Sequence, residues 1–161
     1  MLVRLPKTLN GGLTLKSLGE LAKKYFSASN TGYRFIWPAI IQENGDKSIN
    51  KSQWVLMTND VLPGSRNKNY SEQQKIVADL AEKSLISYEV PETLESAACI
   101  LSQYFGANIC LFSDSPWTYT RCQENVQGYQ VVVGGFAPAG LSVNYVNFDY
   151  SDIGVAALRK F

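Results

Sequence analysis

Apolar residues recur at helical spacing in three stretches of the chain. The first covers residues 15–25. The second follows Ser71, which with Gln74 three residues later predicts a capping box at a helix N-terminus. The third runs from Pro91 to Gly106, a proline and a glycine placed where helices commonly begin and end. We therefore expect a helix in each stretch, with one buried face per helix.

Short apolar runs bounded by turn residues fill most of the remaining chain. These runs have the length and the composition of β-strands. Pro38 is expected to open one further short helix that ends at Glu43, and residues 59–69 form the longest expected loop. Extended segments are expected at residues 2–5, 33–37, 54–57, 109–112, 117–121, 130–133, 141–145 and 153–158.

The order of these elements decides the expected fold class. Helices come mostly before residue 108 and strands mostly after it, and this segregation favours an α+β fold over alternating βαβ units. The length of 161 residues suits one domain with one core. We predict a single α+β domain over residues 1–161, with two or three helices packed on a twisted, mainly antiparallel sheet. This domain can be a C-terminal piece of a longer protein.

The amino-acid composition limits the classes of molecule that the chain is expected to bind. Lysine and arginine number 15 against 14 acidic residues, which leaves a net charge of +1 and no basic cluster for a nucleic-acid backbone. No apolar run approaches the ~20 residues that span a bilayer, so we expect neither a nucleic-acid nor a membrane partner. The first residues lack the sections of a secretory signal peptide. Three cysteines without a C-x-x-C spacing favour a reducing compartment such as the cytoplasm.

Histidine is absent from the chain. This excludes Ser-His-Asp and Cys-His catalysis and removes the commonest zinc ligand. Gly134 and Gly135 follow an apolar strand but lack the spacing of a phosphate-binding loop, so they are expected to allow a bulge or a close backbone approach. Cys122 is expected to be a packed thiol, and residues 144–152 lack the spacing of a calcium loop. We predict no metal and no cofactor.

Residues 113–124 contain more candidate functional side chains than any other segment of similar length. They combine aromatic, cationic and acidic side chains on one short extended segment. The loop at residues 59–69 adds a second polar group. Together they suggest the contact surface of a non-catalytic recognition module for a protein or carbohydrate ligand, with aromatic rings supplying contact area and arginines supplying forked donors to a carboxylate. The expected ligand-binding residues are Asp60, Ser65, Arg66, Asp114, Trp117, Tyr119 and Arg121.

Two other hypotheses remain open from the residues. Asp114 and Glu124 flank the same predicted strand and could act as paired carboxylates of a hydrolase or transferase acting on a sugar or a peptide. Alternatively, the domain is a structural cap or a dimerisation unit; the sequence leaves its oligomeric state and its ligand open. The late aromatic residues form either an exposed platform or part of the core. They are Trp117, Tyr119, Tyr129, Tyr145, Phe148 and Tyr150.

Motifs spread over nearly the whole chain carry a family resemblance. They lie at residues 54–66, 88–95, 116–124, 131–136 and 154–161. In these motifs the chain resembles an uncharacterised domain found at the C-terminal end of proteins from chlamydia-related symbionts of amoebae, sometimes downstream of an F-box-like or leucine-rich-repeat segment. The resemblance implies a host-interacting module delivered to a host cytosol, and it implies no activity.

A second resemblance is one of pattern. The stretch Tyr88–Glu95, the strand Val132–Phe136 and the segment Ile153–Ala156 are similar to motifs of the sulfatase-modifying-factor branch of the C-type-lectin-like fold. This resemblance implies a C-type-lectin-like architecture. The catalytic branch of that family needs a late cysteine pair, and no cysteine follows Cys122. The resemblance therefore implies the fold without the oxidase chemistry.

Overall fold

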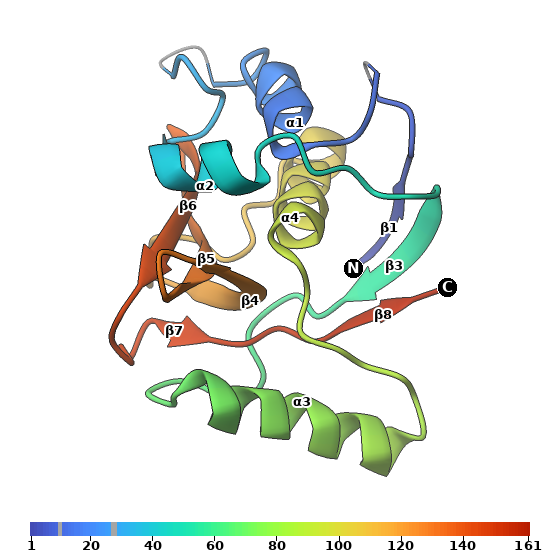
Figure 1. Ribbon diagram of the computed structural model, residues 1–161, viewed down its shortest axis with the longest axis vertical. Coiled ribbons are helices and arrows are strands. Elements are labelled where there is room, and N and C mark those ends of the chain that lie inside the picture. Colours follow the sequence, from blue (N-terminus) through green and yellow to red (C-terminus); the bar gives the residue numbers. More distant parts are fainter. Residues whose placement is uncertain (10, 27–28) are drawn as a thin grey trace.

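The computed structural model describes residues 1–9, 11–26 and 29–161, which form four helices and eight strands in an α+β arrangement (Figure 1). The helices are α1 (Leu15–Ala22), α2 (Pro38–Asn44), α3 (Tyr70–Ser84) and α4 (Thr93–Ala107). The strands are β1 (Leu2–Leu5), β2 (Phe35–Ile36), β3 (Gln53–Met57), β4 (Tyr119–Val126), β5 (Tyr129–Ala137), β6 (Gly140–Val146), β7 (Ile153–Gly154) and β8 (Leu158–Lys160). The predicted α+β class is confirmed.

Helix α4 lies at the centre of the molecule, between two sheets (Figure 1). It contacts β4, β5 and β6 of one sheet and β1 of the other. Its first nine residues, Thr93 to Leu101, are all buried, whereas the apolar pattern predicts one buried face. The small side chains of Ala97, Ala98 and Cys99 allow the helix to pack closely on all sides, which is how a helix fits between two sheets.

The strands form two sheets, where the sequence predicts one. The smaller sheet has the order β1-β3-β8 and is antiparallel throughout. The larger has the order β2-β6-β5-β4-β7, with antiparallel pairs at its centre and parallel pairs at both edges. Residues 153–160 contribute β7 to the larger sheet and β8 to the smaller, because the buried residues Val155 to Ala157 between them cross from one sheet to the other.

The larger sheet has two unlike faces. One face joins the main core with α1 and α4 through residues such as Val131, Val133 and Leu141. The opposite face carries a small separate cluster formed by Tyr119, Val132 and Ile153. This second face is bordered by the loops at residues 58–69 and 147–152, which supply most of the polar residues considered below.

Several predicted boundaries differ from the structure. Helix α3 is capped by Asn69 and Glu72, not by Ser71 and Gln74, because two overlapping capping boxes are present and the earlier one is used. Residues 109–112 form no strand. Left-handed backbone precedes them at Asn108, the C-cap of α4, and ends them at Phe112, with φ of 57° and 51°, and such backbone cannot continue a strand.

Helix α3 is set apart from the other three (Figure 1). Its buried residues are Gln73 and Val77. Val77 packs with Val90, Val155 and Ala157 in a small satellite cluster, so α3 covers the segment that joins the two sheets. Among the described residues, no helix combines the length and the apolar character needed to cross a membrane.

Candidate functional site

The Trp117 pocket is a depression of about 590 Å³ lined by Arg66, Pro116, Trp117, Ser151 and Asp152. Three loops meet there: the loop before α3, the segment before β4 and the loop between β6 and β7. Two of the lining residues, Arg66 and Trp117, belong to the ligand-binding set predicted from the sequence. The pocket is therefore the place where the two predicted polar segments come together.

Arg66 ties these three loops to one another. Its Nη2 donates to Thr118 Oγ1 at 3.0 Å, and its Nη1 donates to the carbonyl oxygens of Ser151 at 3.2 Å and Trp117 at 3.5 Å. The ion pair of Arg66 with Asp60 is loose, since Arg66 Nη2 lies 3.9 Å from Asp60 Oδ1. The guanidinium is thus used mainly to hold the walls of the pocket in place.

Trp117 is the exposed member of a layered aromatic group. Its side chain is 44% exposed and lies parallel to the ring of Tyr119, with 6.0 Å between ring centroids. The guanidinium carbon of Arg34 lies 5.0 Å from the Trp117 ring centroid, within cation–π range. Arg34 Nη1 also donates to Asp114 Oδ2 at 3.0 Å. Asp114 therefore supports the aromatic group through Arg34.

Glycines make room for these rings. A Cβ atom built on Gly135, where φ is +56°, would lie 2.3 Å from Tyr119 Oη and 2.8 Å from Trp117 Cζ3. A Cβ atom on Gly134 would lie 2.1 Å from the carbonyl oxygen of Thr118. The pairing of β5 with β6 is irregular just after Gly134. Both a bulge and a close backbone approach are thus present at the paired glycines, as the sequence predicts.

Asp152 supplies a charged group of the pocket that is left free. Among the described parts of the chain, its carboxylate has no hydrogen bond and no ion pair, although its main-chain oxygen accepts from Tyr119 N at 2.8 Å. Its negative charge is one of the influences that raise the pKa of Tyr119, after burial of the phenol. The pocket thus offers a half-exposed indole next to a free acceptor.

Two predicted contact residues, Ser65 and Arg121, lie inside the protein and do not form part of its exposed surface. Ser65 is 0% exposed, and its hydroxyl accepts from Val155 N at 3.1 Å. Arg121 is 3% exposed. Both side chains are used to hold surface loops against the sheet, and this is the physical reason why they are buried although polar.

The guanidinium of Arg121 is the anchor for two loops. Its Nη1 donates to Lys68 O at 2.7 Å and to Gln73 Oε1 at 3.4 Å. Its Nη2 donates to Phe148 O at 3.0 Å and to Asp149 Oδ1 at 2.6 Å. The expected donor to a ligand carboxylate is therefore already paired with carbonyl groups and a carboxylate of the protein itself.

The two carboxylates of the catalytic hypothesis contact different partners. Asp114 pairs with Arg34. Glu124 accepts from Thr93 N at 3.0 and 2.8 Å and from Thr93 Oγ1 at 2.8 Å, so it caps the N-terminus of α4. Burial raises the pKa of Glu124, and the hydrogen bonds from Thr93 oppose that change. Neither carboxylate lines the Trp117 pocket.

The cysteines are placed as packed thiols or as an isolated surface thiol. Cys99 and Cys122 are buried and Cys110 is exposed. Burial raises the pKa of the Cys99 thiol to about 12 and raises that of Cys122 further, so neither is a thiolate near neutral pH. Among the residues that the structure describes, no group of three or more cysteine, aspartate or glutamate side chains is arranged to hold a metal ion.

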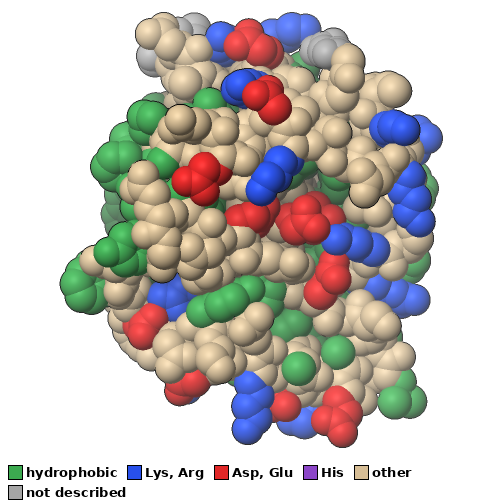
Figure 2. All heavy atoms as spheres, viewed as in Figure 1, with side chains coloured by type: hydrophobic (Ala, Val, Ile, Leu, Met, Phe, Trp, Pro, Cys, Tyr) green, Lys and Arg blue, Asp and Glu red, His purple; other side chains and the backbone are tan. Residues whose placement is uncertain are grey.

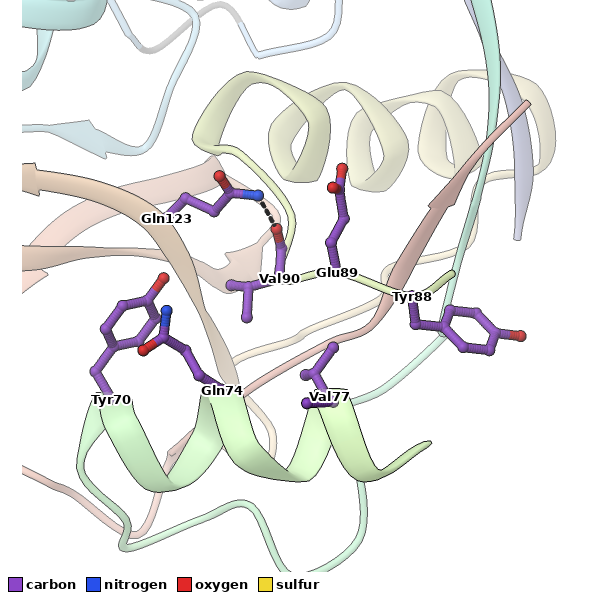
Figure 3. Close-up of a pocket in the computed structure, with 8 residues that line it drawn as sticks. Tyr70, Gln74, Val77, Tyr88, Glu89, Val90 and Gln123 are labelled. Atoms are coloured by element: carbon purple, nitrogen blue, oxygen red, sulfur yellow. Dashed lines mark hydrogen bonds between the residues drawn. The ribbon is translucent and has the colours of Figure 1, made fainter. Parts of the chain in front are cut away.

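A second depression, the α3 cleft, lies between α3 and the extended segment that leads into α4 (Figure 3). It encloses about 430 Å³. Tyr70, Gln74 and Val77 point into it from α3, and Gln123 reaches across from β4 to donate to the carbonyl oxygen of Val90. Its remaining lining residues are Ala78, Tyr88 and Glu89.

The sequence predictions do not include the α3 cleft. A signal for it is nevertheless present, because the buried face of α3 is continued towards its N-terminus by polar residues instead of apolar ones. Tyr70, Gln73 and Gln74 follow one another at helical spacing ahead of Val77. Amide and phenol side chains on the packed face of a helix can form hydrogen bonds with polar groups that lie opposite that face.

Comparison with models of protein families, with curated proteins and with solved structures finds no match to this chain. The two resemblances noted in the sequence therefore stay predictions. Any functional argument has to come from the geometry of the two depressions and of the surface around them.

The late aromatic residues divide into separate pairs, and most of their members are exposed, whereas Tyr119 is buried. Trp117 and Tyr119 form one, and Phe148 and Tyr150 another, with 5.9 Å between centroids. Tyr129 and Tyr145 stack at 5.9 Å, and this pair continues to Trp37 and Phe35. Figure 2 shows hydrophobic side chains gathered along the side of the molecule where β6 lies. The loop that supplies Ser151 and Asp152 to the Trp117 pocket therefore also carries the exposed rings of Phe148 and Tyr150.

Proposed function

We propose that this chain is a non-catalytic recognition module and that the Trp117 pocket is its ligand-contact surface. The observation that best supports the proposal is that Trp117 is exposed and held in place at the same time. Its indole is 44% exposed, while Arg66 binds the main chain of Trp117 and the hydroxyl of Thr118. A large ring fixed in one orientation loses little freedom on binding, and such rings often contribute much of the binding free energy.

The groups left at the pocket favour a ligand that donates hydrogen bonds. Arg66 and Arg34 use their donors within the protein, so they are poorly placed to bind a ligand carboxylate. The carboxylate of Asp152 accepts from no described residue and remains available. A sugar ring would stack on Trp117 and donate its hydroxyls to Asp152. A cationic side chain of a protein ligand would place its ammonium group against the ring of Trp117 and donate hydrogen bonds to Asp152.

Binding measurements with variants of Trp117 test this proposal. Immobilised neutral oligosaccharides and lysine-containing peptides would be screened with the wild-type protein, and the best binder would then be titrated. We expect Trp117→Ala to weaken binding at least about tenfold, as truncation of an aromatic hot spot does. Asp152→Asn should weaken it less, because the amide keeps one acceptor oxygen.

Trp54 supplies the matched control. It is 48% exposed on β3, in the other sheet, so Trp54→Ala removes an equally exposed indole away from the pocket. The control should bind as the wild type does. Equal loss in both variants, or no binding of either ligand class by the wild type, would contradict the proposal.

A further inference from the structure

The α3 cleft is bounded on one side by a strand edge that is only partly paired, since Gln123 donates hydrogen bonds to the carbonyl oxygens of Val90 and Pro91. Glu89 N donates to Leu158 O at 2.8 Å and Leu158 N donates to Glu89 O at 2.9 Å, so Glu89 extends the smaller sheet beyond β8. Backbone groups of successive residues in an extended chain point to opposite sides. The main-chain groups of Tyr88 and Val90 therefore point away from β8, towards the cleft that these two residues line.

Two groups on that edge are left without a partner. Gln123 Nε2 donates to the carbonyl oxygen of Val90, and Tyr88 N donates to Ile86 O at 2.8 Å. Among the described residues, the N–H of Val90 and the C=O of Tyr88 have no hydrogen bond. Val90 is 6% exposed, and an unpaired N–H group at such a position is unfavourable unless something pairs with it.

The opposite wall of the cleft suits an uncharged, hydrogen-bonding main chain. Tyr70 and Gln74 point from α3 towards the strand edge, and Val77 and Val90 provide an apolar floor between them (Figure 3). The one charged lining residue, Glu89, points away from α3 in this view and pairs with Lys160 at 2.7 Å. The cleft therefore presents neutral polar groups over an apolar floor.

We propose that the α3 cleft binds an extended peptide segment by strand addition. The peptide main chain donates to the C=O of Tyr88 and accepts from the N–H of Val90. The side-chain amide of Gln74 and the hydroxyl of Tyr70 contact the other edge of the bound segment. A small apolar side chain of the peptide packs on Val77 and Val90. Main-chain pairing supplies the affinity in this mode of recognition, and the floor selects side chains. The inference does not depend on the ligand of the Trp117 pocket.

The test uses an uncharged, strand-forming peptide and amide chemical shifts of the whole chain. The probe is acetyl-Thr-Val-Thr-Val-Thr-amide, compared with the same peptide N-methylated at its central residues, which keeps the side chains and removes the main-chain donors. We expect saturable shifts at Val90 and Ala78, and at least fivefold weaker binding of the N-methylated peptide.

Two leucine substitutions on α3 distinguish binding in the cleft from binding elsewhere on the helix. Ala78 is exposed and lines the cleft, so Ala78→Leu should block the peptide without unfolding the chain. Lys83→Leu introduces the same side chain on the other flank of α3 and should leave binding unchanged. Equal binding of the two peptides, unchanged binding by Ala78→Leu, or absence of shifts at millimolar peptide would overturn the inference. Shifts confined to the Trp117 pocket would overturn it too, while supporting the proposed recognition surface there.

Discussion

Arg121 shows how one side chain can determine the shape of a surface that it does not reach. Its guanidinium holds Lys68 and Gln73 on one side and Phe148 and Asp149 on the other. The two loops that it joins also supply Arg66, Ser151 and Asp152 to the Trp117 pocket. The pocket therefore depends on a residue buried behind it.

Removal of this guanidinium should lower the stability of the folded chain. We expect Arg121→Ala to lower the free energy of unfolding by about 3 kcal/mol, because it leaves buried carbonyl groups and a carboxylate without their donor. Urea unfolding measures this difference. Arg4, exposed on β1, is the matched control, and Arg4→Ala should change stability by less than about 0.5 kcal/mol. A loss no larger than that of the control would show that Arg121 does not hold the loops.

The sequence could single out Trp117 and Arg66, which line one pocket, as candidate contact residues, but it could not predict the burial of Arg121. Aromatic and guanidinium groups in a dense polar segment are visible from residue types alone. Burial of Arg121 requires partners at residues 68, 73, 148 and 149, which only the folded chain brings together. The same applies to Ser65, whose partner Val155 lies 90 residues away.

At the scale of elements, α4 depends on Glu124 for part of its N-terminal capping. The carboxylate accepts from Thr93 N and Thr93 Oγ1, while burial raises its pKa above the ordinary glutamate value. The folded chain therefore binds a proton at Glu124 more readily than the unfolded chain does. The stability contributed by this protonation is present at low pH and is lost as pH rises through the folded-state pKa.

Comparison with Glu124→Gln isolates this contribution. The amide does not ionise, so the stability of the wild type relative to the variant should increase as pH falls from about 8 towards about 4. Urea unfolding of both proteins across this range gives the difference directly, and contributions of other groups largely cancel. A difference that is constant, or that grows with rising pH, would contradict the pKa assigned to Glu124.

Elements with strong local signals could be predicted, and those decided by packing could not. Pro38 opens α2, as expected, and Thr14 caps α1; both signals act within one turn. The start of α3 is ambiguous locally, since Asn69 with Glu72 and Ser71 with Gln74 both match the capping-box pattern and only the first pair forms the box. The burial of α4 on all sides depends on the sheet formed by β1, β3 and β8, whose strands are far apart in the sequence.

At the scale of the whole molecule, stability should be unevenly distributed. Helix α4 is enclosed by both sheets, whereas α3 is held by Gln73, which donates to Ser65 O and Ile153 O, and by the packing of Val77. We expect amide hydrogens from residue 78 to residue 84 to exchange roughly 100-fold faster than those of the buried part of α4. Hydrogen exchange measured by NMR tests this, and equal protection of the two helices would contradict it.

The smaller sheet also decides how the molecule responds to mechanical force. β1 and β8 flank β3 and are both antiparallel to it. Leu2 lies opposite Leu56, while Lys160 lies opposite Val55 and Phe161 N donates to Trp54 O. Leu2 and Lys160 thus lie on opposite sides of β3 and only one residue apart along it, so tension applied between them acts mainly across the strands. The hydrogen bonds nearest these two residues are then loaded first and open one after another, so the sheet should yield at a lower force here than when it is pulled along its strands.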